Sequence, residues 1–118
     1  ARAFFEAAGC RILVLPEREG HVDLSALIER LGEESIDSVL LEGGGTLNWA
    51  ALEHGLVQRV QAYLAPKLFG GASARSPIGG LGVGLPTQGI HLTNTALTQL
   101  GEDFLIEGEV EGHVYRDR

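Results

Sequence analysis

The sequence predicts an α/β fold with a mostly parallel sheet, flanking helices and a C-terminal antiparallel hairpin. Apolar runs at 11–15 and 39–41 are typical of strands that are covered on both faces. A helical pattern separates them, so the three segments predict a strand–helix–strand unit with parallel strands and a right-handed connection. Near the C-terminus, two apolar stretches separated by a short Gly-containing turn predict the hairpin.

The N-terminal part predicts two helices. Residues 1–8 have the pattern of the end of an amphipathic helix, and Gly9 is suited to terminate it. This start and the lack of any methionine lead us to expect a further portion upstream. After a polar loop at 17–21, Asp23 is an expected N-cap for a crossover helix that ends at Gly32 or soon after. Its apolar positions recur at helical spacing: Leu24, Leu27, Ile28 and Leu31.

A glycine-rich turn follows the second apolar run and leads into another predicted helix. Thr46 is expected to cap a helix over 47–54 that Gly55 terminates, with Trp49 packed against the sheet rather than on a ligand. Residues 59–64 then alternate with period two and predict a strand. Its expected inward positions are Val60, Ala62 and Leu64.

The C-terminal third predicts a long loop and then the hairpin. Residues 70–89 carry seven glycines and two prolines, and we expect a loop that borders a ligand. Strands are expected at 90–100 and 103–110. In the second strand, the predicted buried positions are Phe104, Ile106 and Val110, and the predicted solvated ones are Glu107, Glu109 and Glu111.

The candidate binding site is the turn that begins with Glu42 and runs through Gly43, Gly44 and Gly45. Without side chains the backbone can adopt positive φ, and a ligand can approach its N–H groups. The following helix N-terminus offers free amide donors and the positive end of a dipole, which favour a phosphate. Glu42 stands at the carboxyl end of the predicted strand, where ligands of open α/β sheets bind. The alternative is that the glycines only allow close helix–sheet packing.

The common nucleotide motifs do not fit this turn. A Walker loop requires a Gly-Lys-Ser/Thr ending, and this stretch has no lysine. A dinucleotide GxGxxG that starts at Gly43 would need glycine where Asn48 stands. The sequence therefore predicts a phosphate cradle that is not of the standard Rossmann type.

Composition limits the other function classes. The 118 residues are 44% hydrophobic and 21% charged, which suits one compact domain or part of a larger one. A net charge of −7 argues against a nucleic-acid or anionic-membrane partner. No apolar run is long enough to span a membrane. The single cysteine, Cys10, fits a cytoplasmic protein and is expected to be a buried, inert thiol.

The residues that serve in metal sites and nucleophilic catalysis show no diagnostic spacing in this sequence. The four histidines lack metal-ligand spacing, so we expect no metal site. No GxSxG nucleophile motif is present. Lys67 is compatible with either a phosphate contact or a solvated charge.

Three sequence blocks at fixed spacing resemble the reductase domain of the bifunctional riboflavin-biosynthesis deaminase/reductase. They are Leu40-Leu41-Glu42-Gly43-Gly44-Gly45-Thr46-Leu47, then Gly55-Leu56-Val57, then Tyr63-Leu64-Ala65-Pro66-Lys67-Leu68-Phe69-Gly70-Gly71. The likeness extends over essentially all 118 residues and covers the C-terminal half of that domain, so we expect residues 1–118 to form a single partial domain.

The resemblance implies a dihydrofolate-reductase-like fold and NADPH-dependent reduction of 5-amino-6-(5-phosphoribosylamino)uracil, in which C1 of the opened ribose accepts hydride. It implies that Glu42 contacts the substrate. The residues that it implies for the cofactor are Gly44, Gly45, Thr46, Leu47 and Asn48. It also implies a homo-oligomer, and we expect the 118 residues alone to be inactive.

The chain departs from the family pattern in two places, and two other functions stay open. Gly45 stands where family members often have proline, which is expected to loosen the turn, and Gln58 replaces an aspartate. The alternatives are a non-catalytic nucleotide-binding or assembly fragment, and a pterin or folate reductase of the same fold.

Overall fold

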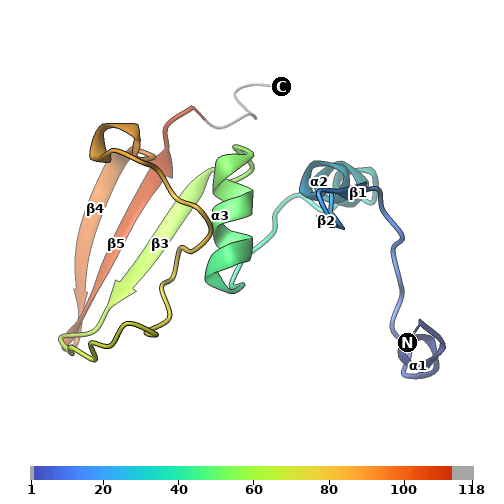
Figure 1. The fold of residues 1–118 in the computed structure, drawn as a ribbon, viewed down its shortest axis with the longest axis horizontal. Helices are drawn as coiled ribbons and strands as arrows, with labels where there is room; N and C mark the ends of the chain where they lie inside the picture. Colours follow the sequence, from blue (N-terminus) through green and yellow to red (C-terminus); the bar gives the residue numbers. More distant parts are fainter. Residues whose placement is uncertain (1, 113–118) are drawn as a thin grey trace. The chain divides into compact units, whose positions relative to one another are not determined.

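The computed structural model of the protein describes residues 2–112, which fall into two compact units with the boundary between Val39 and Leu40 (Figure 1). The first unit holds two helices and a small hairpin, and the second holds one helix and a three-stranded sheet. No helix within the described residues is long and apolar enough to cross a membrane.

Helix α1, Arg2–Ala7, ends as the sequence predicts. Gly9 adopts φ 81°, which a residue without Cβ enters at little cost. Its N–H donates to Glu6 O at 3.0 Å, and the Cys10 N–H donates to Phe5 O at 2.9 Å, so the last carbonyls of the helix are satisfied. Cys10 itself is exposed, and the expectation of a buried thiol is wrong because the residues directly after it, 11–15, form no strand.

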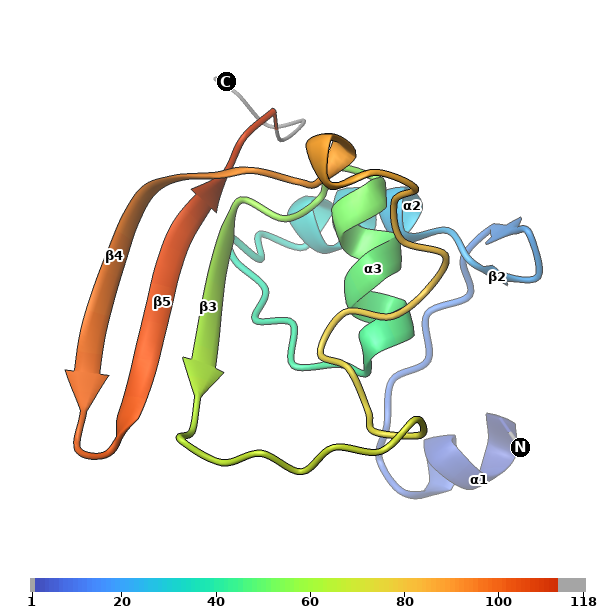
Figure 2. The same cartoon turned by 60° about the vertical axis from the view of Figure 1, so that its left-hand side comes forward.

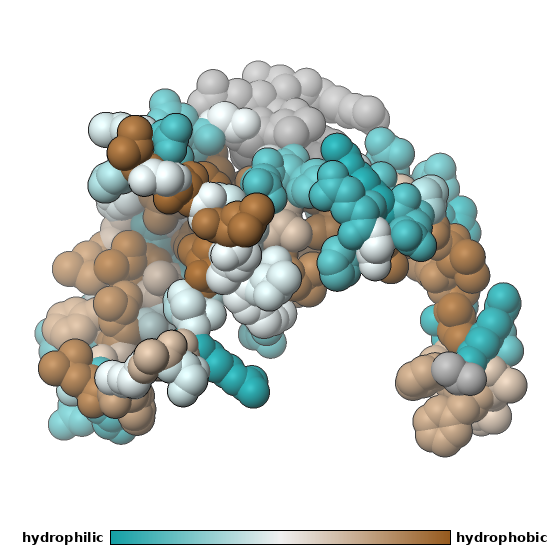
Figure 3. All heavy atoms as spheres, in the orientation of Figure 1, coloured by the Kyte–Doolittle hydropathy of each residue, from teal (hydrophilic) through white to brown (hydrophobic). Residues whose placement is uncertain are grey.

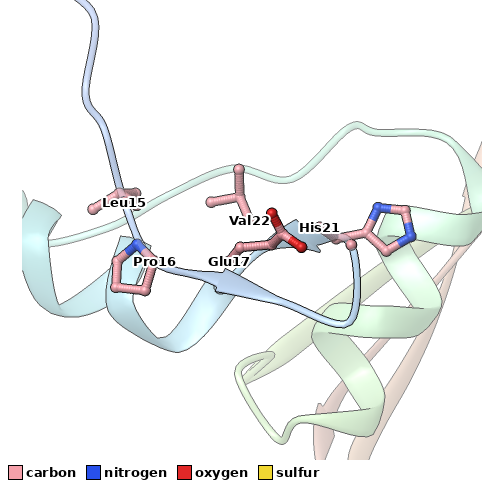
Figure 4. A pocket seen from close by; sticks show the side chains of 6 residues that line it. Leu15, Pro16, Glu17, His21 and Val22 are labelled. Atoms are coloured by element: carbon pink, nitrogen blue, oxygen red, sulfur yellow. The ribbon is translucent and has the colours of Figure 1, made fainter.

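The polar stretch 17–21, which was expected to be a loop, belongs to a small β-hairpin with a two-residue turn. Strands β1, Glu17–Arg18, and β2, His21–Val22, pair antiparallel. Glu19 and Gly20 both have positive φ, 54° and 81°, which is the requirement of a type I′ turn. A pocket in this unit lies at the hairpin (Figure 4) and is lined by Leu15, Pro16, Glu17, Gly20, His21 and Val22.

Helix α2, Leu24–Glu33, confirms the predicted cap and helix, but it is not a crossover between parallel strands because 11–15 and 39–41 form no strand. Asp23 Oδ1 accepts hydrogen bonds from the N–H groups of Ser25 and Ala26, at 2.9 and 3.2 Å. At the other end the C-cap is Glu34, two residues beyond Gly32.

Glu34 joins two arginines of this unit. Its carboxylate accepts a hydrogen bond from Arg11 and lies 3.1 Å from Arg30 Nη2. The hydrogen bond from Arg11 is the main cause that lowers the pKa of Glu34 below its ordinary value, against a smaller opposing effect of desolvation.

The predicted parallel strands are absent. Residues 11–15 and 39–41 form no strand, and every strand pair among residues 2–112 is antiparallel. An apolar run predicts a segment that prefers burial, whereas a strand also needs a neighbour for its ladder hydrogen bonds. The mostly parallel sheet is therefore not the architecture of the described residues.

Helix α3, Gly45–Glu53, begins two residues earlier than predicted, and Gly44 rather than Thr46 is its N-cap. Its end is as expected: Gly55 has φ 67°, and the Leu56 N–H donates to Ala51 O at 2.9 Å. His54 Nδ1 lies 2.7 Å from Ala50 O, so this histidine also helps to cap the last turn.

The sheet has the order β3-β5-β4 and confirms the predicted third strand and hairpin. Strand β3 is Arg59–Leu64, β4 is Leu92–Leu100 and β5 is Asp103–Val110. Both pairings are antiparallel, with a bulge in β4 between Thr93 and Ala96. In Figures 1 and 2, α3 lies beside β3.

Burial in the sheet follows the prediction only in part. Val110 is buried and Ile106 is half-buried, but Phe104 of the same face is 37% exposed. Leu105, on the opposite face, is buried. In β3, Val60 is half-buried and both other positions predicted inward are exposed.

Two glutamates on the face of β5 that was predicted to be solvated make side-chain contacts with neighbouring strands. Glu107 accepts from Gln61 Nε2 at 2.7 Å and pairs with Arg59 at 3.1 Å. Glu109 accepts from Asn94 Nδ2 at 2.9 Å. Cross-strand polar pairs therefore occupy this face.

The chain between β3 and β4 is a long loop, as predicted, interrupted only by the short 3₁₀ helix η1, Pro86–Gln88. Figure 2 shows this loop leaving the end of β3, passing α3 and returning to β4. Figure 3 shows hydrophobic atoms on the surface of the part that holds the strands. The exposed large apolar residues there include Leu64, Leu68, Phe69, Leu81 and Leu97.

Candidate functional site

The glycine turn does not use positive φ. Gly44 has φ −67° and ψ 161°, and neither Gly43 nor Gly45 is in the left-handed region. The expectation of positive φ is therefore wrong, and the glycines have another role. A Cβ on Gly44 would meet no heavy atom within 4 Å, so this residue borders open space.

The first turn of α3 presents unpaired amides beside that space. Gly44 has no side chain to cap them, and the first helical bond runs from Asn48 N to Gly44 O, at 3.1 Å. Within residues 2–112, the N–H groups of Gly45, Thr46 and Leu47 have no hydrogen-bond acceptor. Three free donors at the positive end of a helix dipole favour an anionic group.

Glu42 precedes this turn with an exposed side chain, and it has no ion-pair partner among the described residues. A carboxylate accepts hydrogen bonds and repels phosphate. Its position next to the free amides therefore suits a ligand that carries hydroxyl groups beside an anionic part.

Residues 76–80 of the long loop pack directly on the start of α3. The Gly79 N–H donates to Gly45 O at 2.9 Å. A Cβ on Gly45 would lie 2.6 Å from Ser76 O and 2.9 Å from Gly79 N, so only glycine allows this approach. Gly45 therefore fixes a backbone contact and does not merely loosen the turn.

Two further side chains of α3 face the same segment. Asn48 Nδ2 donates to Pro77 O at 2.8 Å. The Trp49 indole lies against Gly80, where a Cβ would be 2.1 Å from Cδ1. The structure thus brings Asn48 to the loop, and the ring of the half-buried Trp49 packs on the loop as well.

The loop residues at this contact were not singled out by the sequence. Glycines at 79 and 80 are a signal of close backbone approach, but seven glycines between 70 and 89 leave the partner undefined. Contacts between residues 29 positions apart, such as Asn48 and Pro77, require the fold.

Two other expectations concern Lys67 and a metal site. Lys67 is exposed, and its side chain makes no ion pair within the described residues. Among residues 2–112, no group of three or more metal-ligating side chains lies together.

The chain matches the RibD C-terminal domain over residues 3–106. It belongs to the RibD C-terminal domain family. This assignment agrees with the resemblance carried by the three sequence blocks.

Named relatives and solved structures agree with this family. The chain is 47% identical over 103 residues to the riboflavin biosynthesis protein RibD of Actinobacillus pleuropneumoniae, covering 87% of this chain and 27% of that protein. It is 41% identical over 91 residues to 2,5-diamino-6-ribosylamino-4(3H)-pyrimidinone 5′-phosphate reductase of Methanothermobacter thermautotrophicus, covering 77% and 42%. The structure of Acinetobacter baumannii RibD, form 2, superposes with a TM-score of 0.67 at 27% identity, covering 80% of this chain and 29% of that one.

These matches support a dihydrofolate-reductase-like fold of the RibD kind. The chain spans about a quarter of the Actinobacillus protein and about two-fifths of the Methanothermobacter protein.

Proposed function

We propose that this chain supplies part of a reductase that converts the ribosyl group of a phosphorylated aminopyrimidine, 5-amino-6-(5-phosphoribosylamino)uracil, to ribityl with NADPH. The family membership and the reductase name of the Methanothermobacter relative support the reaction class. The observation that carries the binding site is the uncapped start of α3, with free amides beside the open space at Gly44.

The amides of Gly45, Thr46 and Leu47 are proposed to hold a phosphate of the cofactor. They fit such a group because they point out of a helix N-terminus and lack any other acceptor in the described chain. The Gly44, Gly45, Thr46, Leu47 and Asn48 assignments implied by the resemblance are retained as a proposal, with Asn48 acting through the loop.

Glu42 is proposed to bind substrate hydroxyls. Its carboxylate is exposed next to the cradle, where it would repel a phosphate but accept hydrogen bonds from ribose or ribityl groups. A bound NADPH would supply the hydride to C1 of the opened ribose, and a proton would complete the reduction. The described residues contribute binding and orientation to that step.

The proposal includes a cytoplasmic reaction and a homo-oligomeric protein. The lone cysteine of the sequence supports a reducing compartment. The exposed apolar residues of the sheet support self-association.

The test is NADPH binding by Gly44→Val in the full natural protein. The native φ of −67° and the open space around Gly44 allow valine without a clash, so the fold is expected to survive. The branched side chain would fill the space beside the amides, so NADPH affinity should fall by at least about tenfold, which is about 1.4 kcal/mol.

Calorimetric titration with NADPH measures the loss, with circular dichroism as the check of folding. NADH in the same titration tests which nucleotide the protein prefers. A folded Gly44→Val protein with unchanged NADPH affinity would remove the α3 cradle from the proposal.

A further inference from the structure

The start of α3 and the loop segment 76–80 form one connected unit. Three independent contacts join them: the Gly79 N–H to Gly45 O, the Asn48 amide to Pro77 O, and the Trp49 ring against Gly80. All three come from the first five residues of the helix, next to the free amides.

The segment is shaped to make these contacts. Ser76 Oγ donates to Ile78 O at 2.7 Å and accepts from the Ile78 N–H at 3.3 Å, which folds 76–78 into a tight turn. This turn presents Pro77 O to Asn48. Proline cannot donate a backbone hydrogen bond, so its carbonyl is its one polar backbone group for such a contact.

Asn48 supplies the only side-chain hydrogen bond among these contacts in the described chain. Its Nδ2 faces a carbonyl, so the orientation of the amide is fixed, since the reversed amide would set two acceptors together. Asn48 Oδ1 is enclosed and has no hydrogen-bond partner within residues 2–112. The donor half of the side chain therefore makes the connection.

We propose that Asn48 is a positioning residue that holds segment 76–80 on α3, and that ligand binding at the α3 amides and closure of this segment are coupled. The connection itself follows from the contacts. The coupling rests on the proposed function, because a ligand at the first turn touches the same few residues that hold the segment. By linkage, a ligand that stabilises the closed segment is itself bound more tightly when the segment is closed.

Limited trypsin cleavage after Arg75 measures the connection in the ligand-free full natural protein. Arg75 is exposed and directly precedes the segment. A protease needs the residues on both sides of the bond released from other contacts, so cleavage reports the open population. Asn48→Leu keeps the size and removes the polar group, and Asn48→Asp replaces the donor with a charged acceptor that the Pro77 carbonyl repels.

Both variants should speed cleavage by about threefold to tenfold, the effect of losing one neutral hydrogen bond. The matched control is Glu53→Gln, which is exposed at the far end of the same helix and should cleave at the unmodified rate. Rates for both Asn48 variants equal to that of the control would overturn the positioning role.

A substitution at Gly80 is expected to open the same segment without changing Asn48. Gly80→Ala places a methyl group on the Trp49 ring at a φ of +72°. Its effect on cleavage should be less than additive with that of Asn48→Leu, because loss of one contact already loosens the short segment that makes the other. Full additivity would show that the two contacts act independently and would contradict a single connected unit.

The coupling is tested with NADP⁺ and NADPH. NADP⁺ should slow cleavage of the unmodified protein, and Asn48→Leu should raise the KM for NADPH more than it lowers kcat. Tight NADP⁺ binding with an unchanged cleavage rate would overturn the coupling alone. No NADP⁺ binding at all would overturn the coupling together with the proposed function, while the ligand-free cleavage still decides the positioning role.

Discussion

At the scale of single residues, Glu42 has the most specific proposed chemistry. It is exposed and unpaired within the described residues, so its charge is available to a ligand. In the full enzyme, Glu42→Gln should raise the substrate KM or lower kcat by a factor that corresponds to about 1.5–3 kcal/mol, with little change in NADPH affinity. Steady-state kinetics with each ligand varied separately measures this. A variant weakened only toward NADPH would assign Glu42 to the cofactor.

Glu34 gives a residue-scale prediction on pH. Its pKa is lowered in the folded protein, so it binds its proton more readily when unfolded, and its stabilising effect is present above the ordinary value of 4.5. That effect is lost as the pH falls below 4.5 through the lowered folded pKa. The difference in urea midpoint between the unmodified protein and Glu34→Gln should therefore shrink on acidification.

The matched control for this titration is Glu33→Gln. Glu33 pairs with the same Arg30, at 3.0 Å, but its side chain is 67% exposed. An exposed pair contributes little, so Glu33→Gln should show a smaller midpoint difference at pH 7. Equal pH dependence of the two variants would show that the contact with Arg11 does not set the Glu34 effect.

At the scale of elements, the start of α3 offers a comparison of neighbouring glycines. Gly45→Ala places a methyl group against the backbone of 76–80 and should destabilise the protein by about 1–3 kcal/mol, although alanine is the better helix former. Gly44→Ala meets open space and loses only part of the N-cap preference, under about 1 kcal/mol. Denaturant unfolding of both variants measures the free energies.

Cleavage after Arg75 separates the two glycine variants further. Only Gly45→Ala displaces the loop, so only this variant should be cut faster. Equal stability and equal cleavage of the two would show that the loop does not rest on Gly45.

Elements with local signals were predictable from the sequence. Asp23 carries its own capping chemistry, so the start of α2 is correct to the residue. Alternation in 59–64 and the Gly101 turn, with φ 65°, likewise locate β3 and the hairpin. Each of these signals is contained within a few neighbouring residues.

Elements that depend on distant partners were not predictable. The apolar runs at 11–15 and 39–41 indicate burial but contain no information about a pairing strand, and they are not strands here. The N-cap shifted from Thr46 to Gly44 because Gly44 takes the N-cap conformation without a side-chain bond. The 76–80 contact depends on a loop whose path is a property of the fold.

At the scale of the whole molecule, the exposed apolar residues predict association. On one face of the sheet Leu64 is 47% exposed, Leu97 is 68% exposed and Phe104 is 37% exposed. Each exposed apolar residue leaves free energy to be gained from burial, at about 25 cal/mol per Å². We therefore expect this face to be covered by a second chain or by another part of the protein.

We accordingly predict that the isolated 118 residues self-associate and show negligible NADPH oxidation with the phosphoribosylaminopyrimidine substrate. The chain spans 27% of the Actinobacillus protein and 42% of the Methanothermobacter protein. Alignment of a nicotinamide with its acceptor carbon needs contacting residues on several sides of both groups. Multi-angle light scattering measures the association, and a steady-state assay measures the oxidation. As a matched pair, Leu97→Lys should reduce association, whereas Thr98→Lys on the other face should not. A stable monomer with full turnover would show that these residues hold the complete catalytic apparatus.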